Sequence, residues 1–180
     1  MMTPNEWDQA EREIVRAWTT GAVAEALQQI ESVLGQGDEE QRGRALMYRG
    51  SIKEESANWD AAKGDFIQAV GLFRPGSYPR YTAELSVGHS YEKAGEKQQA
   101  VQWYRAALLT CTQADELFSG ATATKALLAL EPVLAPKDME LARAATVRSW
   151  QVLNLAGEPD LDDLGSATET LMQRASNPDV

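Results

Sequence analysis

Residues 91–109, YEKAGEKQQAVQWYRAALL, carry the pattern that decides the fold. Their composition favours a helix, and the one interruption is Gly95. After it, Ala100, Tyr104 and Ala107 follow at spacings of four and three residues, so these side chains share one helical face. We therefore predict that Gly95 is the turn between the two arms of a helical hairpin, and that Tyr104 packs inside the hairpin.

The same spacing occurs twice more upstream, in steps of 36 and 38 residues. The three sets are Ala26, Ile30 and Val33; Ala62, Phe66 and Ala69; and Ala100, Tyr104 and Ala107. Twelve residues before each first alanine stand Ile14, Gly50 and Gly88, and a small residue there lets the two helices of a hairpin approach closely. Because a lone amphipathic hairpin cannot bury its apolar face, we expect the hairpins to stack.

The order Gly-x2-Tyr, then Ala-x3-aromatic-x2-Ala, resembles the tetratricopeptide repeat (TPR) family, whose units span about 34 residues. The third unit matches at Val87, Gly88, Tyr91, Gly95, Ala100, Tyr104 and Ala107, and the second at Leu46, Gly50, Ala62, Phe66 and Ala69. Glu84 stands where the family has tryptophan. Arg49 and Lys53 stand where it has apolar residues, which leaves the packing of that helix open. The resemblance is specific over 45–109, weak over 5–35 and only architectural beyond residue 112.

Almost every segment has a helical composition, and prolines and glycines fall near segment ends. We predict an all-α fold of about nine helices in one domain, residues 1–180. Its hairpins are predicted at about 4–35, 39–73, 79–110 and 113–155, with a capping helix at about 160–175. Thr112 with Asp115 is predicted to cap the first helix of the last hairpin. The family resemblance implies a right-handed superhelix of stacked antiparallel hairpins, an α-solenoid.

The formal net charge of −10 and the single cysteine limit the classes of function. An acidic surface repels phosphate, and no cluster of Lys and Arg offsets it, so neither nucleic acid nor an anionic membrane is an expected partner. Cys111 has no second cysteine to bridge, which fits a reducing compartment, and no apolar run reaches membrane-spanning length. We expect a cytoplasmic bacterial protein, a monomer or a homodimer, whose partner is a basic or neutral protein or peptide.

The sequence carries no pattern typical of catalysis or of a bound cofactor. The only histidine, His89, and the only cysteine, Cys111, have no nucleophile motif around them. The run Gly35-Gln36-Gly37 lacks the third glycine of a phosphate-binding loop. Ser86 stands where a Glu-x-x-His metal motif requires glutamate. We therefore expect no metal and no cofactor, and we interpret the paired acids as solvated helix faces.

In the TPR family the first helix of each hairpin lines a concave groove, and this resemblance places one stripe of each unit there. The candidate groove residues are Trp18; Arg44, Met47, Ser51 and Glu54; and Thr82, Leu85, His89 and Glu92. The first unit adds Asp8, Glu11 and Val15.

We expect a non-enzymatic scaffold that binds a peptide with basic and apolar residues in this groove. The alternatives are a small secretion-type chaperone, a neutralising or regulatory partner of a basic protein, and an enzyme that uses His89. A stripe of ordinary exposed positions is also an alternative.

Overall fold

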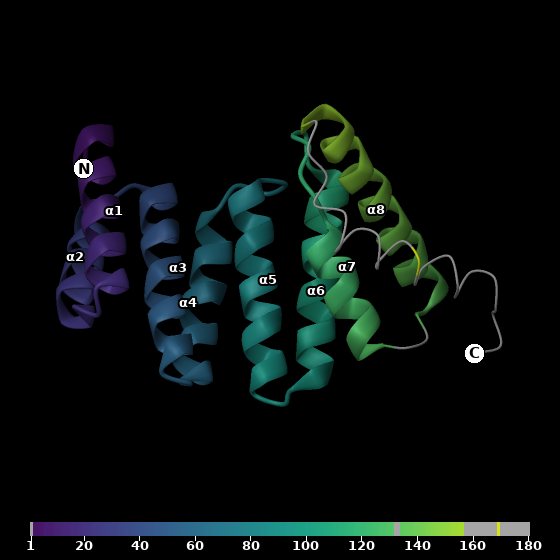
Figure 1. Ribbon diagram of the computed structural model, residues 1–180, viewed down its shortest axis with the longest axis horizontal. Helices are drawn as coiled ribbons and strands as arrows, with labels where there is room; N and C mark the ends of the chain where they lie inside the picture. The colour runs from purple at the N-terminus through teal and green to yellow at the C-terminus, as the bar shows by residue number, and fades with distance from the viewer. Residues whose placement is uncertain (1, 132–133, 157–168, 170–180) are drawn as a thin grey trace.

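The computed structural model describes residues 2–131, 134–156 and 169, and this part of the chain forms eight α-helices and no strand (Figure 1). The predicted all-α class is confirmed. The helices, in pairs along the chain, are α1 (Pro4–Thr19) and α2 (Val23–Gln36), α3 (Glu39–Glu55) and α4 (Trp59–Leu72), α5 (Tyr78–Lys93) and α6 (Lys97–Gln113), and α7 (Ala121–Leu130) and α8 (Pro136–Ala156).

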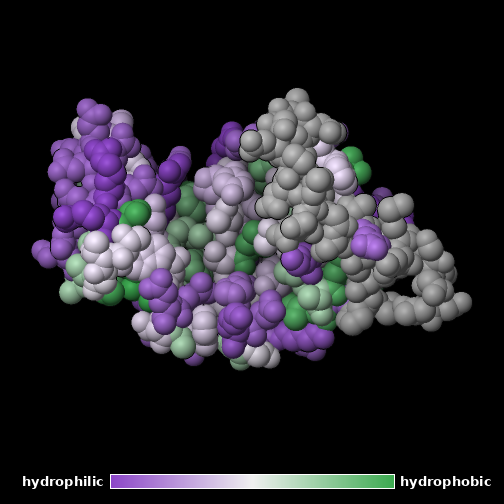
Figure 2. Space-filling model, viewed as in Figure 1, coloured by the Kyte–Doolittle hydropathy of each residue, from purple (hydrophilic) through white to green (hydrophobic). Residues whose placement is uncertain are grey.

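The helices form a row in which each one packs against the next (Figure 1). The first helices of neighbouring hairpins also touch, α1 with α3 and α3 with α5, so they form a common face. Each of these three helices begins at a side-chain N-cap, Thr3, Asp38 or Ser77. Figure 2 shows mostly hydrophilic side chains where α1 and α2 lie.

The first three hairpins share one turn geometry. The residue at the turn has a positive φ in each, which is 80° at Gly21, 54° at Ala57 and 80° at Gly95. The next residue donates its N–H to the carbonyl five positions earlier in all three turns, a bond that ends the first helix with a left-handed residue. The prediction that Gly95 is a turn is therefore confirmed, and the repeat is visible in the backbone itself.

The two arms of a hairpin meet at the glycine and the aromatic residue of the repeat. A Cβ atom on Gly88 would lie 2.6 Å from the ring of Tyr104, and one on Gly50 would be closer still to the ring of Phe66. The first hairpin solves the same contact differently, since its residues are Ile14 and Ile30, both fully buried in one cluster. The space between the two arms is thus filled either by a glycine opposite an aromatic ring, as in the second and third hairpins, or by two isoleucines, as in the first.

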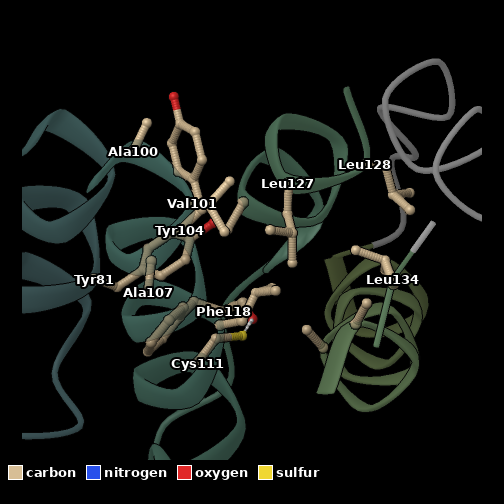
Figure 3. Close-up of a cluster of buried hydrophobic side chains, with 14 of the residues drawn as sticks. Tyr81, Ala100, Val101, Tyr104, Ala107, Cys111, Phe118, Leu127, Leu128 and Leu134 are labelled. Atoms are coloured by element: carbon tan, nitrogen blue, oxygen red, sulfur yellow. Dashed lines mark hydrogen bonds between the residues drawn. The ribbon is translucent and has the colours of Figure 1, made fainter. Parts of the chain in front are cut away.

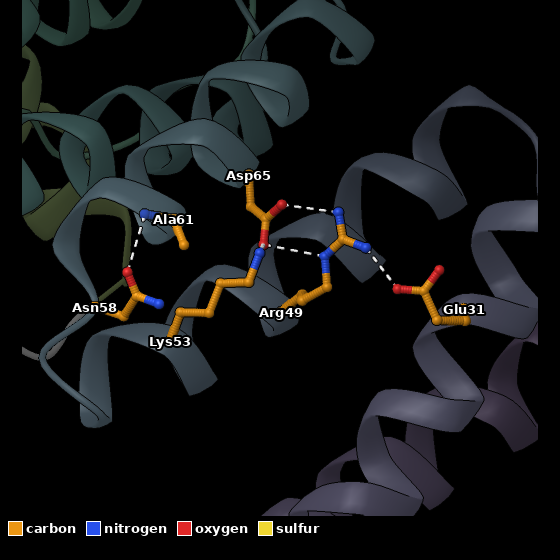
Figure 4. A network of polar contacts seen from close by, with 6 residues as sticks. All are labelled: Glu31, Arg49, Lys53, Asn58, Ala61 and Asp65. Atoms are coloured by element: carbon orange, nitrogen blue, oxygen red, sulfur yellow. Dashed lines mark hydrogen bonds and ion pairs between the residues drawn. The ribbon is translucent and has the colours of Figure 1, made fainter.

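Arg49 and Lys53, which occupy positions that are apolar in the TPR signature, converge on one buried carboxylate (Figure 4). Asp65 on α4 is 2 % exposed and accepts hydrogen bonds from Arg49 Nε and Nη2 at 3.0 and 2.8 Å, and from Lys53 Nζ at 2.6 Å. Arg49 Nη1 reaches Glu31 of α2 at 2.6 Å. The network therefore ties three successive helices together, and the open question about the packing of α3 is answered by charge pairing.

The predicted start of the fourth hairpin at residue 113 is wrong. Helix α6 continues to Gln113, and α7 begins only at Ala121. The hydroxyl of Thr112 donates to the carbonyl of Leu109 instead of capping a new helix. The intervening segment buries Phe118, whose ring centroid lies 5.1 Å from that of Tyr81. A linker that contributes a core aromatic thus replaces the short turn expected there.

The C-terminal core joins this linker to α6, α7 and α8, and it surrounds the thiol of Cys111 (Figure 3). Leu127 of α7 and Leu134, which precedes α8, pack in the same cluster on the side away from Tyr81 (Figure 3). The capping helix predicted at about 160–175 lies outside the described residues, apart from Glu169. The eight described helices thus correspond to the first eight of the nine predicted.

Candidate functional site

Two neighbouring cavities open on the face formed by the first helices of the hairpins. A cavity of about 550 Å³ lies between α5, α6 and α7, and we call it the α5–α7 cavity. A second cavity of about 380 Å³ lies between α1, α3 and α5, and we call it the α1–α3 cavity. Thr82 lines both. The two cavities together are called the groove below, and Figure 2 shows hydrophobic side chains recessed between α3 and α5.

The structure brings seven of the twelve candidate residues to these cavities. Thr82, Leu85, His89 and Glu92 line the α5–α7 cavity, and Glu11, Arg44, Met47 and again Thr82 line the α1–α3 cavity. The remaining five, Asp8, Val15, Trp18, Ser51 and Glu54, line neither of the two. Two of these still contact the neighbouring hairpin, since Trp18 Nε1 donates to Glu55 at 2.8 Å and Glu54 binds His89.

The sequence analysis missed the walls that come from outside the three stripes. In the α5–α7 cavity these are Ser86, Tyr104, Thr122, Lys125, Ala126 and Ala129; in the α1–α3 cavity they are Tyr48, Phe73, Tyr78 and Pro79. The four α7 residues have the spacing of one helical face, which was a usable signal. The repeat signature is absent from α7, so no stripe was assigned there.

Glu54 of α3 joins the second hairpin to the third through polar contacts with α5. Its Oε1 accepts a hydrogen bond from Ser90 Oγ at 2.5 Å and lies 3.3 Å from His89 Nδ1. Burial raises the pKa of Glu54, but the hydrogen bonds from His89 and Ser90 outweigh it, so the pKa is lowered overall. The hydrogen bond to Glu54 raises the pKa of His89 against the effect of burial. Glu54 is therefore an ionised group on this face.

Tyrosine hydroxyls hold two further carboxylates of this face. Tyr104 donates to Glu92 Oε2 at 2.6 Å, and Tyr48 donates to Glu11 Oε1 at 3.0 Å. Burial, followed by the hydrogen bond to Glu11, raises the pKa of Tyr48 to about 12. Burial and the bond to Glu92 likewise raise the pKa of Tyr104. Both tyrosines therefore remain donors at neutral pH and fix the carboxylates in place.

The polar groups near His89 do not have the order needed for nucleophilic catalysis. A nucleophile has to contact a base that a third group orients. Ser90 is fully buried and donates to Glu54 and to the carbonyl of Ser86, so the carboxylate stands between the serine and the histidine. Cys111 is fully buried, donates to the carbonyl of Phe118, and has a pKa raised to about 11 by burial. Such a thiol is a packed core residue.

Within residues 2–131, 134–156 and 169, no group of three or more His, Cys, Asp or Glu side chains is placed to hold a metal ion. In the same residues, no helix is both long and apolar enough to cross a membrane. In comparisons with known proteins, no protein-family model matches the chain and no curated protein matches it.

Proposed function

We propose that this protein is a non-enzymatic scaffold of the TPR type, which binds a segment of another protein along the groove. The observation that carries the proposal is that the α1–α3 and α5–α7 cavities adjoin at Thr82. Two adjoining cavities on consecutive hairpins fit an elongated ligand that places one side chain in each. In this proposal the stack continues as a right-handed superhelix, with the groove on its concave side.

The walls of the groove support a peptide-like ligand. Met47, Phe73 and Pro79 give the α1–α3 cavity apolar walls, and Leu85 and Ala129 do the same in the α5–α7 cavity. Hydroxyl and carboxylate groups stand between these apolar walls, as in sites that combine side-chain pockets with polar contacts. Helix packing and hydrogen bonds between hairpins hold the walls in place, which lowers the entropic cost of binding.

A scaffold that neutralises or regulates a basic protein is the second candidate function. It is favoured by the net charge of −10 and by the carboxylates Glu11, Glu54 and Glu92 on the groove face. It differs from the first candidate in the size of the partner surface, because a folded basic protein would also contact exposed acids outside the groove.

The test is a selection of groove ligands from a random-peptide library displayed on phage, followed by affinity measurements with the selected peptides. Met47→Glu and Leu85→Glu place a charge in each cavity, and Ala129→Glu does so at an exposed position that the fold tolerates. We expect each to weaken binding by about tenfold or more. The matched control is Ile67→Glu, an exposed apolar residue of α4 that lines neither cavity. Equal binding by all four variants would exclude the groove.

A further inference from the structure

The carboxylates of the groove face are held by neutral donors, whereas carboxylates that join helices elsewhere are held by cations. On the groove face, Trp18 binds Glu55, Tyr48 binds Glu11, Ser90 binds Glu54 and Tyr104 binds Glu92. Elsewhere in the described residues, the corresponding pairs are Arg49 and Lys53 with Asp65, Lys63 with Glu96, Arg16 with Glu25, and Arg105 with Glu131 and Asp138.

This difference matters because a neutral donor orients a carboxylate without cancelling its charge. Glu55 and Glu92 form no ion pair with any Lys or Arg of the described residues, and each is fixed through one oxygen, Oε2. Among the described residues, no donor is bound to the second oxygen of either. Glu54 is also bound by His89, and Glu11 lies 3.9 Å from Arg44, so these two are partly compensated.

Three cations lie near the groove, namely Arg44, Lys93 and Lys125. Arg44 lines the α1–α3 cavity and pairs with Glu40 at 2.9 Å. The charge of Lys93 acts on Glu54 and His89. Lys125 stands on the α7 wall of the α5–α7 cavity, across from Glu92 on α5. Leu85 on the α5 wall and Ala126 and Ala129 on the α7 wall add apolar surface to the same cavity. Apolar walls lower the local dielectric and strengthen the attraction between a carboxylate and an incoming cation.

From this geometry, and resting on the proposed function, we propose that the segment bound in the groove is basic. A Lys or Arg side chain of the partner enters the α5–α7 cavity, packs its methylene groups against Leu85 and Ala129, and places its charge against Glu92, while Glu54, which contacts His89 beside the cavity, adds negative potential. Long cationic side chains commonly bury their stem along an apolar surface in this way. The α1–α3 cavity, with Met47 and Phe73 in its wall, takes an apolar side chain of the same segment.

The experiment uses the full-length protein and the random-peptide selection on phage, read out as the residue composition of the recovered peptides. We expect the wild-type protein to enrich Lys and Arg at one position relative to the unselected library. The double variant Glu54→Gln/Glu92→Gln keeps the acceptors that Ser90 and Tyr104 need, and it should lose this enrichment. A representative Lys peptide should bind it about tenfold more weakly, and the same peptide with Gln in place of Lys should bind the wild-type protein about tenfold more weakly.

The control is Glu116→Gln/Glu140→Gln, which makes the same change in net charge at two exposed acids away from the cavities. It should retain the Lys and Arg enrichment, which separates a local contact from general attraction to an acidic protein. Binders without this enrichment, or with an enrichment that Glu54→Gln/Glu92→Gln retains, would overturn the basic-segment inference and leave the groove function intact. Recovery of no peptide whose binding depends on Leu85 or Ala129 would overturn both. Circular dichroism confirms that each variant is folded.

Discussion

The second and third hairpins share one backbone frame, but they place their charged residues at different positions of it. Both have the same turn, the same glycine against an aromatic ring, and the same buried alanines. In the second hairpin, Arg49, Lys53 and Asp65 form a buried network. At the corresponding positions, 38 residues later, the third hairpin has Val87, Tyr91 and Trp103, which pack in an apolar cluster.

One helical turn before Arg49 and Val87, the difference is reversed, so that the second hairpin has the apolar residue and the third has the charged one. The second hairpin has Leu46 there, buried in its core, and the third has Glu84, which is 2 % exposed and bound to Arg80 at 3.0 Å. The shared backbone arrangement of the two hairpins is therefore set by a few positions, such as Gly50 and Gly88, at which the two helices approach closely. At the other positions either apolar or charged side chains are accepted, provided that every charge finds a partner.

The largest expected effect is the loss of Asp65. Asp65→Ala removes the only carboxylate that Lys53 contacts and leaves Arg49 with Glu31 alone among the described residues. Stranding partly buried cations in this way lowers the free energy of unfolding by about 3 kcal/mol. Chemical denaturation measures this change. Glu31→Ala is the control, since that side chain is 62 % exposed and its loss should cost less than about 1 kcal/mol.

The comparison also predicts how to repair the loss. The triple variant Arg49→Val, Lys53→Tyr and Asp65→Trp copies the third hairpin into the second. Buried ion networks can often be replaced by packed apolar groups at little or no cost, so this variant should be markedly more stable than Asp65→Ala. If it is less stable than Asp65→Ala, the two hairpins are not interchangeable at these positions.

The next effect tests the shared contact between the arms. Gly50→Ala and Gly88→Ala each push a methyl group into an aromatic ring, Phe66 or Tyr104. We expect each to lower the free energy of unfolding by about 2 kcal/mol, by overpacking. Gly64→Ala on α4 is the matched control, because its added methyl meets open space and alanine favours the helix by about 1 kcal/mol. A loss of similar size at Gly64→Ala would show that the ring contacts at Gly50 and Gly88 are not the cause.

The frame could be predicted from the sequence because its signals are local. The turn at Gly95 and the spacing from Gly88 to Tyr104 lie within one hairpin, so they recur at fixed offsets. The segment after Ala107 could not be predicted in the same way. Its helix-forming composition continues through Gln113, and the position of the linker depends on the burial of Phe118 in a core built from four helices, α5 to α8.

Only part of the groove could be predicted, for a similar physical reason. The first-helix stripes placed Leu85 and His89 at a cavity, since helical periodicity fixes which residues share a face. The α7 wall and the donors that hold the carboxylates were missed. The bond from Trp18 to Glu55 and the bond from Tyr48 to Glu11 each join residues 37 positions apart on different helices, and no local spacing encodes such pairs.

A smaller effect is expected at the turn that differs between the hairpins. Ala57 adopts a φ of 54°, whereas the first and third hairpins have glycine there. A residue with a Cβ atom is strained in this conformation by about 1 kcal/mol, so Ala57→Gly should stabilise the protein by about that amount. Gly95→Ala is the reciprocal change and should destabilise it equally. Thermal unfolding of the two variants measures both, and a loss of stability in Ala57→Gly would contradict the shared-turn interpretation.

The last prediction concerns Glu84, the charge that the third hairpin has and the second lacks. Burial raises the pKa of Glu84 above its ordinary value of 4.5, although hydrogen bonds that its carboxylate accepts from Thr110 and Arg80 act in the opposite direction. The folded state thus binds this proton more tightly than the unfolded state does. The stability due to the protonated form is fully present below about pH 4.5 and is lost as the pH rises through the pKa of the folded state.

Glu84→Gln keeps the shape of the side chain but cannot ionise. Its free energy of unfolding, measured in urea at pH 4 and pH 7.5, should exceed that of the wild-type protein by more at pH 7.5 than at pH 4. Glu39→Gln, an exposed acid of α3, should show no such pH-dependent difference. If the free energies of unfolding of the two glutamine variants show the same pH dependence, the ion pair with Arg80 offsets the cost of burying Glu84. The buried charge of the third hairpin then destabilises the fold no more than the buried charges of the second.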